Sequence, residues 1–195
     1  MSTWLETSRK AAAEADEALA LPSLSDEHWR FTSLRGIDFD RYAVSTTPAA
    51  GETTGAILAE GDHAGRIAMR DGGVVLDELA PEVAAQGIVF GSLARLADEH
   101  AALIEPILGR IVGYDEKFAA ENGALWTDGL LLHVPTGVKV ELPFHAVYEI
   151  ATREAAQQWR VVVSLGEGAE ATLVEEHLTG VPGYANGVAE LVLEP

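Results

Sequence analysis

The C-terminal part of the sequence, residues 124–195, is divided into short apolar segments by glycine-bearing turns. The segments are LLLHV, VKVELPF, VYEI, RVVVSL, ATLVEEHL and VAELVL, and the turns include TDG, PTG, GEG and PGYANG. Strands of this length with such turns are typical of a β-sandwich or a β-helix. LLLHV and RVVVSL are continuous apolar runs, as expected of strands covered on both faces, whereas sandwich strands joined by hairpins usually alternate. The pattern therefore favours coils stacked on coils.

The preceding residues predict helices mixed with short strands. Thr3 and Glu6 have the spacing of a capping box, which predicts a helix from about residue 4 to residue 20 that Leu21-Pro22 ends. RIAMR and VVLDEL are joined by Asp71-Gly72-Gly73. This arrangement predicts a β-hairpin, because glycine supplies the positive φ that a tight hairpin turn needs.

Two further helices are expected before residue 124. Ser92 has the position of an N-cap in front of residues spaced three or four apart, which are Leu93, Leu96, Ala97, His100 and Ile104. Pro106 should kink or restart that helix. A short helix is predicted from Asp115 to Asn122, with Gly123 as the left-handed residue that ends it. Beyond it, only the polar stretch TREAAQQ has helical character.

Composition narrows the function. The chain has 13 Lys and Arg residues and 31 Asp and Glu residues, a net charge of −18, and such a field repels phosphate backbones, so nucleic-acid binding is not expected. Cysteine is absent, which removes disulfides, thiolate nucleophiles and cysteine-ligated metal or cluster sites from this chain. No segment reaches the roughly 20 apolar residues that span a bilayer, and the first residues lack the apolar stretch of a signal peptide. We expect a soluble cytoplasmic protein.

Residues 21–42 interleave aromatic and basic side chains, namely Trp29, Phe31, Phe39 and Tyr42 with Arg30, Arg35 and Arg41. Such a segment could stack nucleic-acid bases. The net charge favours the other interpretation, a turn-rich segment whose aromatic rings anchor it to the body. Residues 46–65 are small and polar, and predict a surface loop with at most one strand, AILAE.

Three blocks share an ordered pattern. In LPSLSDEHWRFTSLRGIDFD the matching positions are Leu21, Pro22, Glu27, Trp29, Arg30, Thr32 and Leu34, with Phe31 where tyrosine is common. In DEKFAAENGALWTDGLLLHVPTGVKVELP they are Phe118, Asn122, Asp128, Gly129, Val134, Pro135, Gly137, Val138 and Pro143, with departures at Glu121 and Gly123-Ala124. In WRVVVSLGEGAEATLVEEH they are Arg160, Gly168, Ala169, Glu175 and Glu176. Together these blocks resemble the SufD-type subunit of the SufBCD iron-sulfur cluster assembly complex, in the SufB/SufD family.

The resemblance implies a mainly β fold with an α/β front end: an N-terminal helical and mixed region over residues 1–123, then the first coils of a right-handed parallel β-helix over residues 124–195. It covers about the first half of the family's pattern. The later coils, the segment that binds the SufC ATPase and the positions credited with cluster assembly would lie beyond Pro195. The implied function is a non-catalytic scaffold subunit that acts with SufB-like and SufC-like partners. No catalytic, cofactor-binding or metal-binding residue carries over.

Few other side chains carry chemistry. Imidazole and carboxylate groups brought together by stacked coils could bind Fe(II) or zinc, and the candidates are His133, His145, Glu175, Glu176 and His177. Their spacing has no ligand signature, and outward-facing solvated positions explain them equally well, so no metal site is predicted. GEGAEA, from Gly166, lacks the third glycine and the following helix of a dinucleotide-binding motif.

An alternative function comes from Glu141, Glu149 and Glu175. If these carboxylates lined one groove, the chain could be an acidic β-helix carbohydrate-processing enzyme. A further expectation concerns VAELVLEP, where the last coil would expose an apolar edge and unpaired strand groups. We expect this open end of the β-helix to pair with another copy or to make the chain prone to association.

Overall fold

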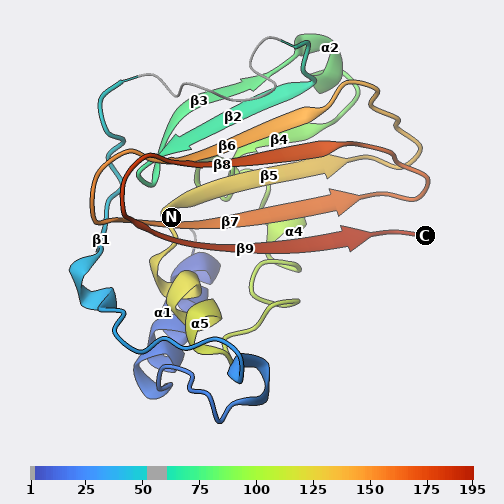
Figure 1. Ribbon diagram of the computed structural model, residues 1–195. Coiled ribbons are helices and arrows are strands. Elements are labelled where there is room, and N and C mark those ends of the chain that lie inside the picture. The colour runs from blue at the N-terminus through green and yellow to red at the C-terminus, as the bar shows by residue number, and fades with distance from the viewer. Residues whose placement is uncertain (1–2, 52–60) are drawn as a thin grey trace.

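The computed structural model describes residues 3–51 and 61–195, and its two β-sheets face each other (Figure 1). Sheet A has the order β1-β7-β5-β4, with β9 paired to the other edge of β7, and sheet B has the order β3-β2-β6-β8. The strands of sheet A are β1 (Ala43–Val44), β4 (Val89–Ser92), β5 (Asp128–Val134), β7 (Ala155–Leu165) and β9 (Tyr184–Leu193). Those of sheet B are β2 (Gly65–Arg70), β3 (Gly73–Leu79), β6 (Phe144–Ile150) and β8 (Leu173–Thr179). The expected mainly β content is confirmed.

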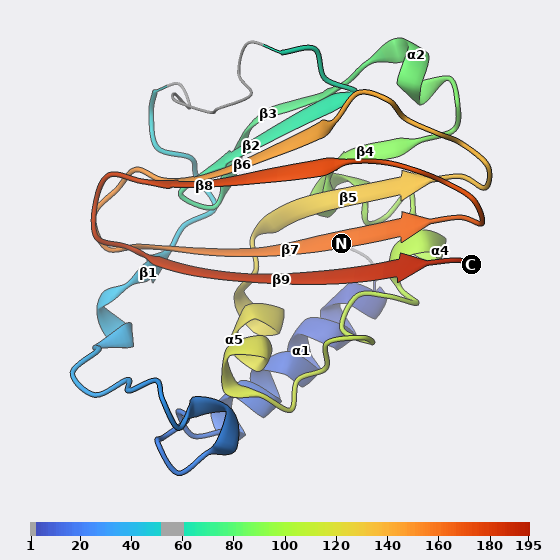
Figure 2. The ribbon, with the colours of Figure 1, turned by 45° about the vertical axis from the view of Figure 1, so that its right-hand side comes forward.

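From β5 onward the chain alternates between the two sheets. β5, β7 and β9 pair in parallel in sheet A, and β6 and β8 pair in parallel in sheet B. The turns are stacked as well: Gly137 and Gly168 both have positive φ, and the Gly137 N–H donates to the carbonyl of Glu167 at 2.8 Å. The chain therefore winds back and forth between two sheets with its strands in parallel register, as Figure 2 shows.

The predicted hairpin between β2 and β3 is confirmed. Its two central residues, Asp71 and Gly72, have φ values of 48° and 87°, the left-handed pair that a two-residue turn of a right-twisted hairpin requires. The Asp71 Oδ1 atom accepts hydrogen bonds from the N–H groups of Ala151 (2.8 Å) and Thr152 (3.1 Å). The turn is thereby fixed to the end of β6 as well as to its own strands.

Helix α1 (Thr3–Ala18) packs against α5 (Lys117–Leu125), and both lie on the side of sheet A that faces away from sheet B (Figure 1). The prediction for Gly123 is wrong, because this glycine lies inside α5 and does not end it. A Cβ atom there would lie 2.4 Å from the Tyr114 ring and 2.8 Å from the Ala12 Cβ. Gly123 thus permits close packing of the two helices.

The helix predicted after Ser92 is correct at its start and wrong in its length. The Ser92 hydroxyl caps it by accepting from the Arg95 N–H at 3.1 Å. The segment then forms two short helices, α3 (Leu93–Leu96) and α4 (Ala101–Ile104), which lie before Pro106. A third short helix, α2 (Pro81–Ala84), follows β3.

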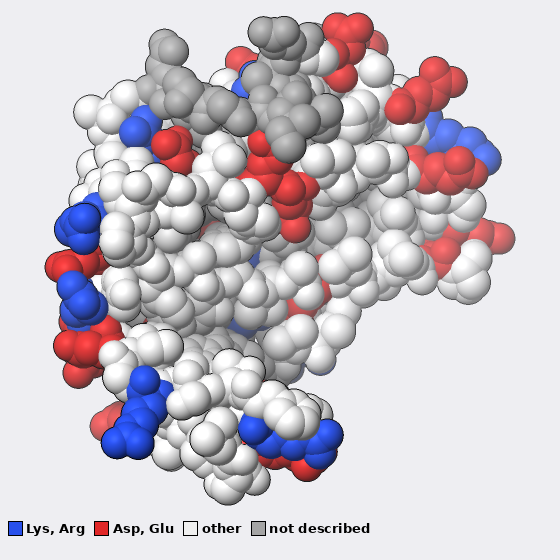
Figure 3. All heavy atoms as spheres, viewed as in Figure 1, with Lys and Arg blue, Asp and Glu red and all other residues white. Residues whose placement is uncertain are grey.

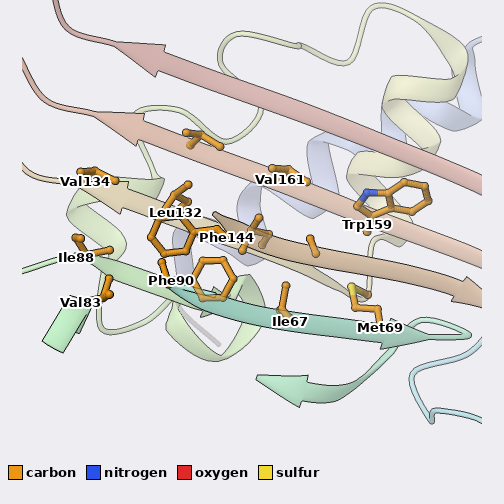
Figure 4. Close-up of a cluster of buried hydrophobic side chains, with 14 of the residues drawn as sticks. Ile67, Met69, Val83, Ile88, Phe90, Leu132, Val134, Phe144, Trp159 and Val161 are labelled. Carbon is orange, nitrogen blue, oxygen red and sulfur yellow. The ribbon is translucent and has the colours of Figure 1, made fainter. Parts of the chain in front are cut away.

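The larger hydrophobic core lies between the sheets. β2 and β6 supply Ile67, Met69 and Phe144 from sheet B, while β5 and β7 supply Leu132 and Val161 from sheet A (Figure 4). The Phe144 ring stacks on Phe90 of β4 with centroids 5.0 Å apart.

A second core joins sheet A to the helices. Leu131 of β5 and Val162 of β7 point into it, away from the first core, and meet apolar residues of α1, α3, α4 and the following loop, namely Leu5, Leu93, Leu96, Ile104, Ile107 and Leu108. β5 and β7 are therefore buried on both faces, which is why their sequences are continuous apolar runs.

Two segments differ from the sequence expectation. TREAAQQ is not helical in its second half: Gln157 and Gln158 lie in β7 and are fully buried. VKVELPF makes only an isolated bridge, Lys139 with Glu170, before β6 begins at Phe144. The strand expected at AILAE lies outside the described residues. The division at residue 123 stays a prediction, although both sheets contain strands from each side of it.

In the part of the chain that the structure describes, no helix has both the length and the apolar character needed to cross a membrane.

Candidate functional site

The histidine and glutamate candidates for a metal site fall in three separate places. His133 lies on the helix-covered face of sheet A, where its Nδ1 atom is 3.3 Å from the Ser164 hydroxyl. His145 and Glu176 lie together on the outer face of sheet B. His177 lies on the inner face, stacked on Tyr148 with ring centroids 5.2 Å apart. Among the described residues, no group of three or more His, Asp or Glu side chains could hold a metal ion.

The pair formed by His145 and Glu176 corrects the expectation of solvated positions. Their side chains are 0% and 8% exposed, and the His145 Nε2 atom lies 3.0 Å from the Glu176 Oε1 atom. Burial lowers the pKa of His145, while the Glu176 carboxylate acts in the opposite direction. The His63 ring lies 5.3 Å from the His145 ring, centroid to centroid. A neutral His145 that donates its Nε2–H to Glu176 therefore fits this site, and the pair binds β6 to β8.

The three carboxylates of the alternative function do not share a groove. Glu175 is in register with Ala146, which is part of the inner core, so it lies on the inner face of sheet B. Glu149 has the opposite parity along β6 and pairs with Arg70 at 3.9 Å on the outer face. Glu141 is exposed in the segment before β6. This geometry does not bring the carboxylates together as a catalytic pair.

The most completely buried ion pair was missed by sequence reasoning. Arg160 of β7 and Glu190 of β9 are 1% and 0% exposed, with Nη1 and Oε2 2.9 Å apart. The Glu190 carboxylate also accepts from four consecutive backbone N–H groups, those of residues 109–112, at 2.8 to 3.2 Å. A charged residue within each of the apolar runs RVVV and VAELV was the available signal. The pair attaches the loop after α4 to sheet A.

Asn122 and Asp128 stand at two junctions between helix and sheet. The Asn122 Oδ1 atom accepts from the Arg160 Nε at 2.6 Å, and its amide donates to the carbonyls of Trp159 (3.0 Å) and Asn186 (2.8 Å). Asp128 accepts from the Ser92 hydroxyl at 2.7 Å and from the Gly129 N–H at 2.7 Å. Burial raises the pKa of the Asp128 carboxyl. These side chains hold the start of β5 against α3 and α5.

The aromatic residues of segment 21–42 do anchor it to the body, through short 3-10 turns at Glu27–Trp29 and Phe39–Arg41. Trp29 and Phe39 pack on Phe118 of α5 with ring centroids 5.2 and 5.5 Å apart, and Phe39 and Tyr42 meet Tyr184 of β9 at 5.4 and 5.9 Å. Phe31 is the exception. Its side chain is 86% exposed.

These rings border a hollow of about 560 Å³, which we call the aromatic hollow. It is lined by Trp29, Leu34, Ile37, Phe39, Tyr42, Phe118 and residues 183–186. At its edge the Tyr184 hydroxyl donates to the Glu121 carboxylate at 2.7 Å. Burial raises the pKa of both groups, and the hydrogen bond to Glu121 raises that of Tyr184 further. The hollow therefore offers a mostly aromatic surface.

Comparison with known proteins places the matched part of this fold in one family. Residues 66–145 match the family model described as the SufBD protein N-terminal region. An iron-sulfur cluster assembly SufBD family protein of Mycobacterium tuberculosis is 31% identical over 113 residues, which are 57% of this chain and 13% of that protein. The iron-sulfur cluster assembly protein SufB of Bacillus subtilis is 33% identical over 113 residues, 57% of this chain and 24% of that protein. A SufBD family protein of Staphylococcus aureus is 30% identical over an equal length.

The class defined by these matches is a SufBD-type N-terminal region, which here runs from β2 to the start of β6. The resemblance of the chain to the SufB/SufD family, over an N-terminal part, is thereby confirmed. The match spans less than a quarter of the length of the curated relatives.

Proposed function

We propose that this chain is a non-catalytic, SufD-like scaffold subunit of the cytoplasmic machinery that assembles iron-sulfur clusters, and that it acts with SufB-like and SufC-like partners. The observation that carries the proposal is the match of residues 66–145 to the SufBD N-terminal region, across strands that join both sheets. Assembly of iron-sulfur clusters is what the names of its relatives state of them. The chain has no cysteine of its own, so a role that relies on the sulfur of partners is consistent with its composition.

We further propose that β5 to β9 are the first coils of a parallel β-helix. Three features support this description: the alternation between sheets, the parallel register of every strand pair from β5 onward, and the stacked turns at Gly137 and Gly168. Side chains of successive coils then stack on one another and make a stiff body whose flanks are available for contacts.

The buried charges support a structural role for the chain. Arg160 with Glu190 and His145 with Glu176 each join neighbouring parallel strands of one sheet. The carbohydrate-processing alternative loses its basis, because Glu149 and Glu175 lie on opposite faces of sheet B.

The proposal is tested by mass photometry of the purified chain mixed with SufB-like and SufC-like subunits of the same organism, at about 0.15 M salt, where long-range attraction is screened. We expect a stable complex with the SufB-like subunit. An unrelated acidic protein of similar size serves as the control for non-specific attraction. Capture of neither subunit, with the chain shown to be folded by circular dichroism, would contradict the partner assignment.

A further inference from the structure

The aromatic hollow and an exposed aromatic side chain lie in one short segment. Phe31 is 86% exposed, and its ring is covered only on one side, where the Arg30 guanidinium carbon lies 4.7 Å from the ring centroid. Trp29, two residues earlier, lines the hollow. Leu21, Leu24 and Ile37 are 47%, 56% and 48% exposed. A cluster of exposed apolar side chains beside an aromatic hollow marks an interaction surface, whereas single exposed apolar residues do not.

Charge distinguishes this surface from the rest of the molecule. Residues 21–42 contain three of the 13 basic and four of the 31 acidic residues, a net charge of −1 in a chain of −18. Figure 3 shows blue groups along the left and lower margins of the face in view. Arg30 is paired with Glu27 at 2.7 Å, and Arg41 with Glu154. Two acidic copies can therefore approach each other through this segment with less repulsion than elsewhere.

We propose that the aromatic hollow of one copy receives the Phe31 side chain of a second copy, in a dimer with twofold symmetry. A protruding ring and a matching hollow on one surface are what a twofold axis requires, since each contact is then made twice. A hollow of about 560 Å³ is large enough to receive a phenyl ring beside Trp29 and Phe39. Aromatic pairs of this kind gain energy beyond the area that they bury.

The expected affinity is modest. Two phenylalanine side chains and the surrounding leucine and isoleucine surfaces would bury on the order of 1,000 Å² over both copies, near the lower limit for a specific interface. We therefore expect dissociation in the micromolar range. Because each copy carries a charge of −18, added salt should strengthen the dimer by screening the repulsion between copies.

This surface differs from the open end of the β-sheets, where the sequence predicts a second mode of self-association. At that end Leu191 and Leu193 of β9 are 53% and 63% exposed. The aromatic hollow touches β9 only at residues 184–186, near its start. The two modes can be separated by substitution, and neither depends on the proposed role in iron-sulfur cluster assembly.

The experiment is sedimentation velocity of the 195-residue chain alone, from about 1 µM to about 100 µM, the range expected for a small interface. Phe31→Ala removes the inserted ring, and Ile37→Glu places a charge in the hollow. Val75→Glu, at a 38% exposed position on β3, is the matched control for adding a charge. Leu193→Glu tests the open end. Circular dichroism of each variant verifies the fold.

We expect the wild type, Val75→Glu and Leu193→Glu to form dimers as concentration rises. Phe31→Ala and Ile37→Glu should each weaken the dimer at least tenfold, since truncation of a central aromatic anchor commonly has such an effect. A wild type that stays monomeric at the highest concentration would overturn the proposal. So would dimers that survive in Phe31→Ala and Ile37→Glu, or dimers that Leu193→Glu alone abolishes.

Discussion

Replacing Glu190 with glutamine should strongly destabilise the protein. The side chain is 0% exposed, it faces Arg160, and it accepts from the N–H groups of residues 109–112. Glutamine keeps the shape and one acceptor oxygen but leaves the Arg160 guanidinium buried without a counter-ion. Removing one partner of a buried pair commonly costs about 3–5 kcal/mol. For a domain of this size each kcal/mol lowers Tm by about 2–4 °C, so a fall of roughly 6–20 °C is expected.

Urea unfolding followed by tryptophan fluorescence measures this loss. Glu194→Gln, at an exposed position two residues after β9 begins its last turn of contacts, is the matched control and should change stability by no more than about 0.5 kcal/mol. Arg160→Met combined with Glu190→Gln should cost less than the sum of the single changes, because the uncompensated charge is then gone. A loss below about 1 kcal/mol for Glu190→Gln, or strict additivity in the double variant, would refute the reasoning.

Three further changes test other contacts. Gly123→Ala should cost about 1–3 kcal/mol in urea unfolding, although alanine favours helices, because its Cβ would lie 2.4 Å from the Tyr114 ring; unchanged or higher stability would contradict this packing. Ser92→Ala should cost about 1–2 kcal/mol, since it removes the cap of α3 and a hydrogen bond to Asp128, and wild-type stability would count against the cap. His145 has a lowered pKa in the folded state, so below about pH 6.5 the unfolded state binds the proton first and stability falls as pH falls. His145→Gln, which can still donate to Glu176, should show a smaller loss of stability between about pH 7.5 and pH 5.5 than the wild type, and equal losses would exclude His145 as the cause.

Local rules predicted the elements whose causes are local. Asp71-Gly72 determines a hairpin turn because few residue pairs adopt two successive positive φ values, and Ser92 caps a helix through its own hydroxyl. The apolar runs of β5 and β7 predicted burial on both faces, and the two cores provide it.

The errors arose where distant contacts decide. A glycine at the end of a helical pattern usually ends the helix, but the role of Gly123 depends on Tyr114 and Ala12. Gln157 and Gln158 have weak strand preference, yet they lie in the middle of sheet A between β9 and the helices. Similarly, no sequence rule pairs Arg160 with Glu190, because parallel register across a turn brings them together.

The bonds from Glu190 to the loop after α4 also affect the order in which the chain can fold during synthesis. The N–H groups of residues 109–112 are produced about eighty positions before the carboxylate that accepts their hydrogen bonds. While a ribosome is still translating β6 to β8, that loop has no partner of this kind, and the helical region has to wait in an incomplete state. A protease added to chains stalled before residue 190 should therefore cut this loop readily, and chains stalled well after it should resist.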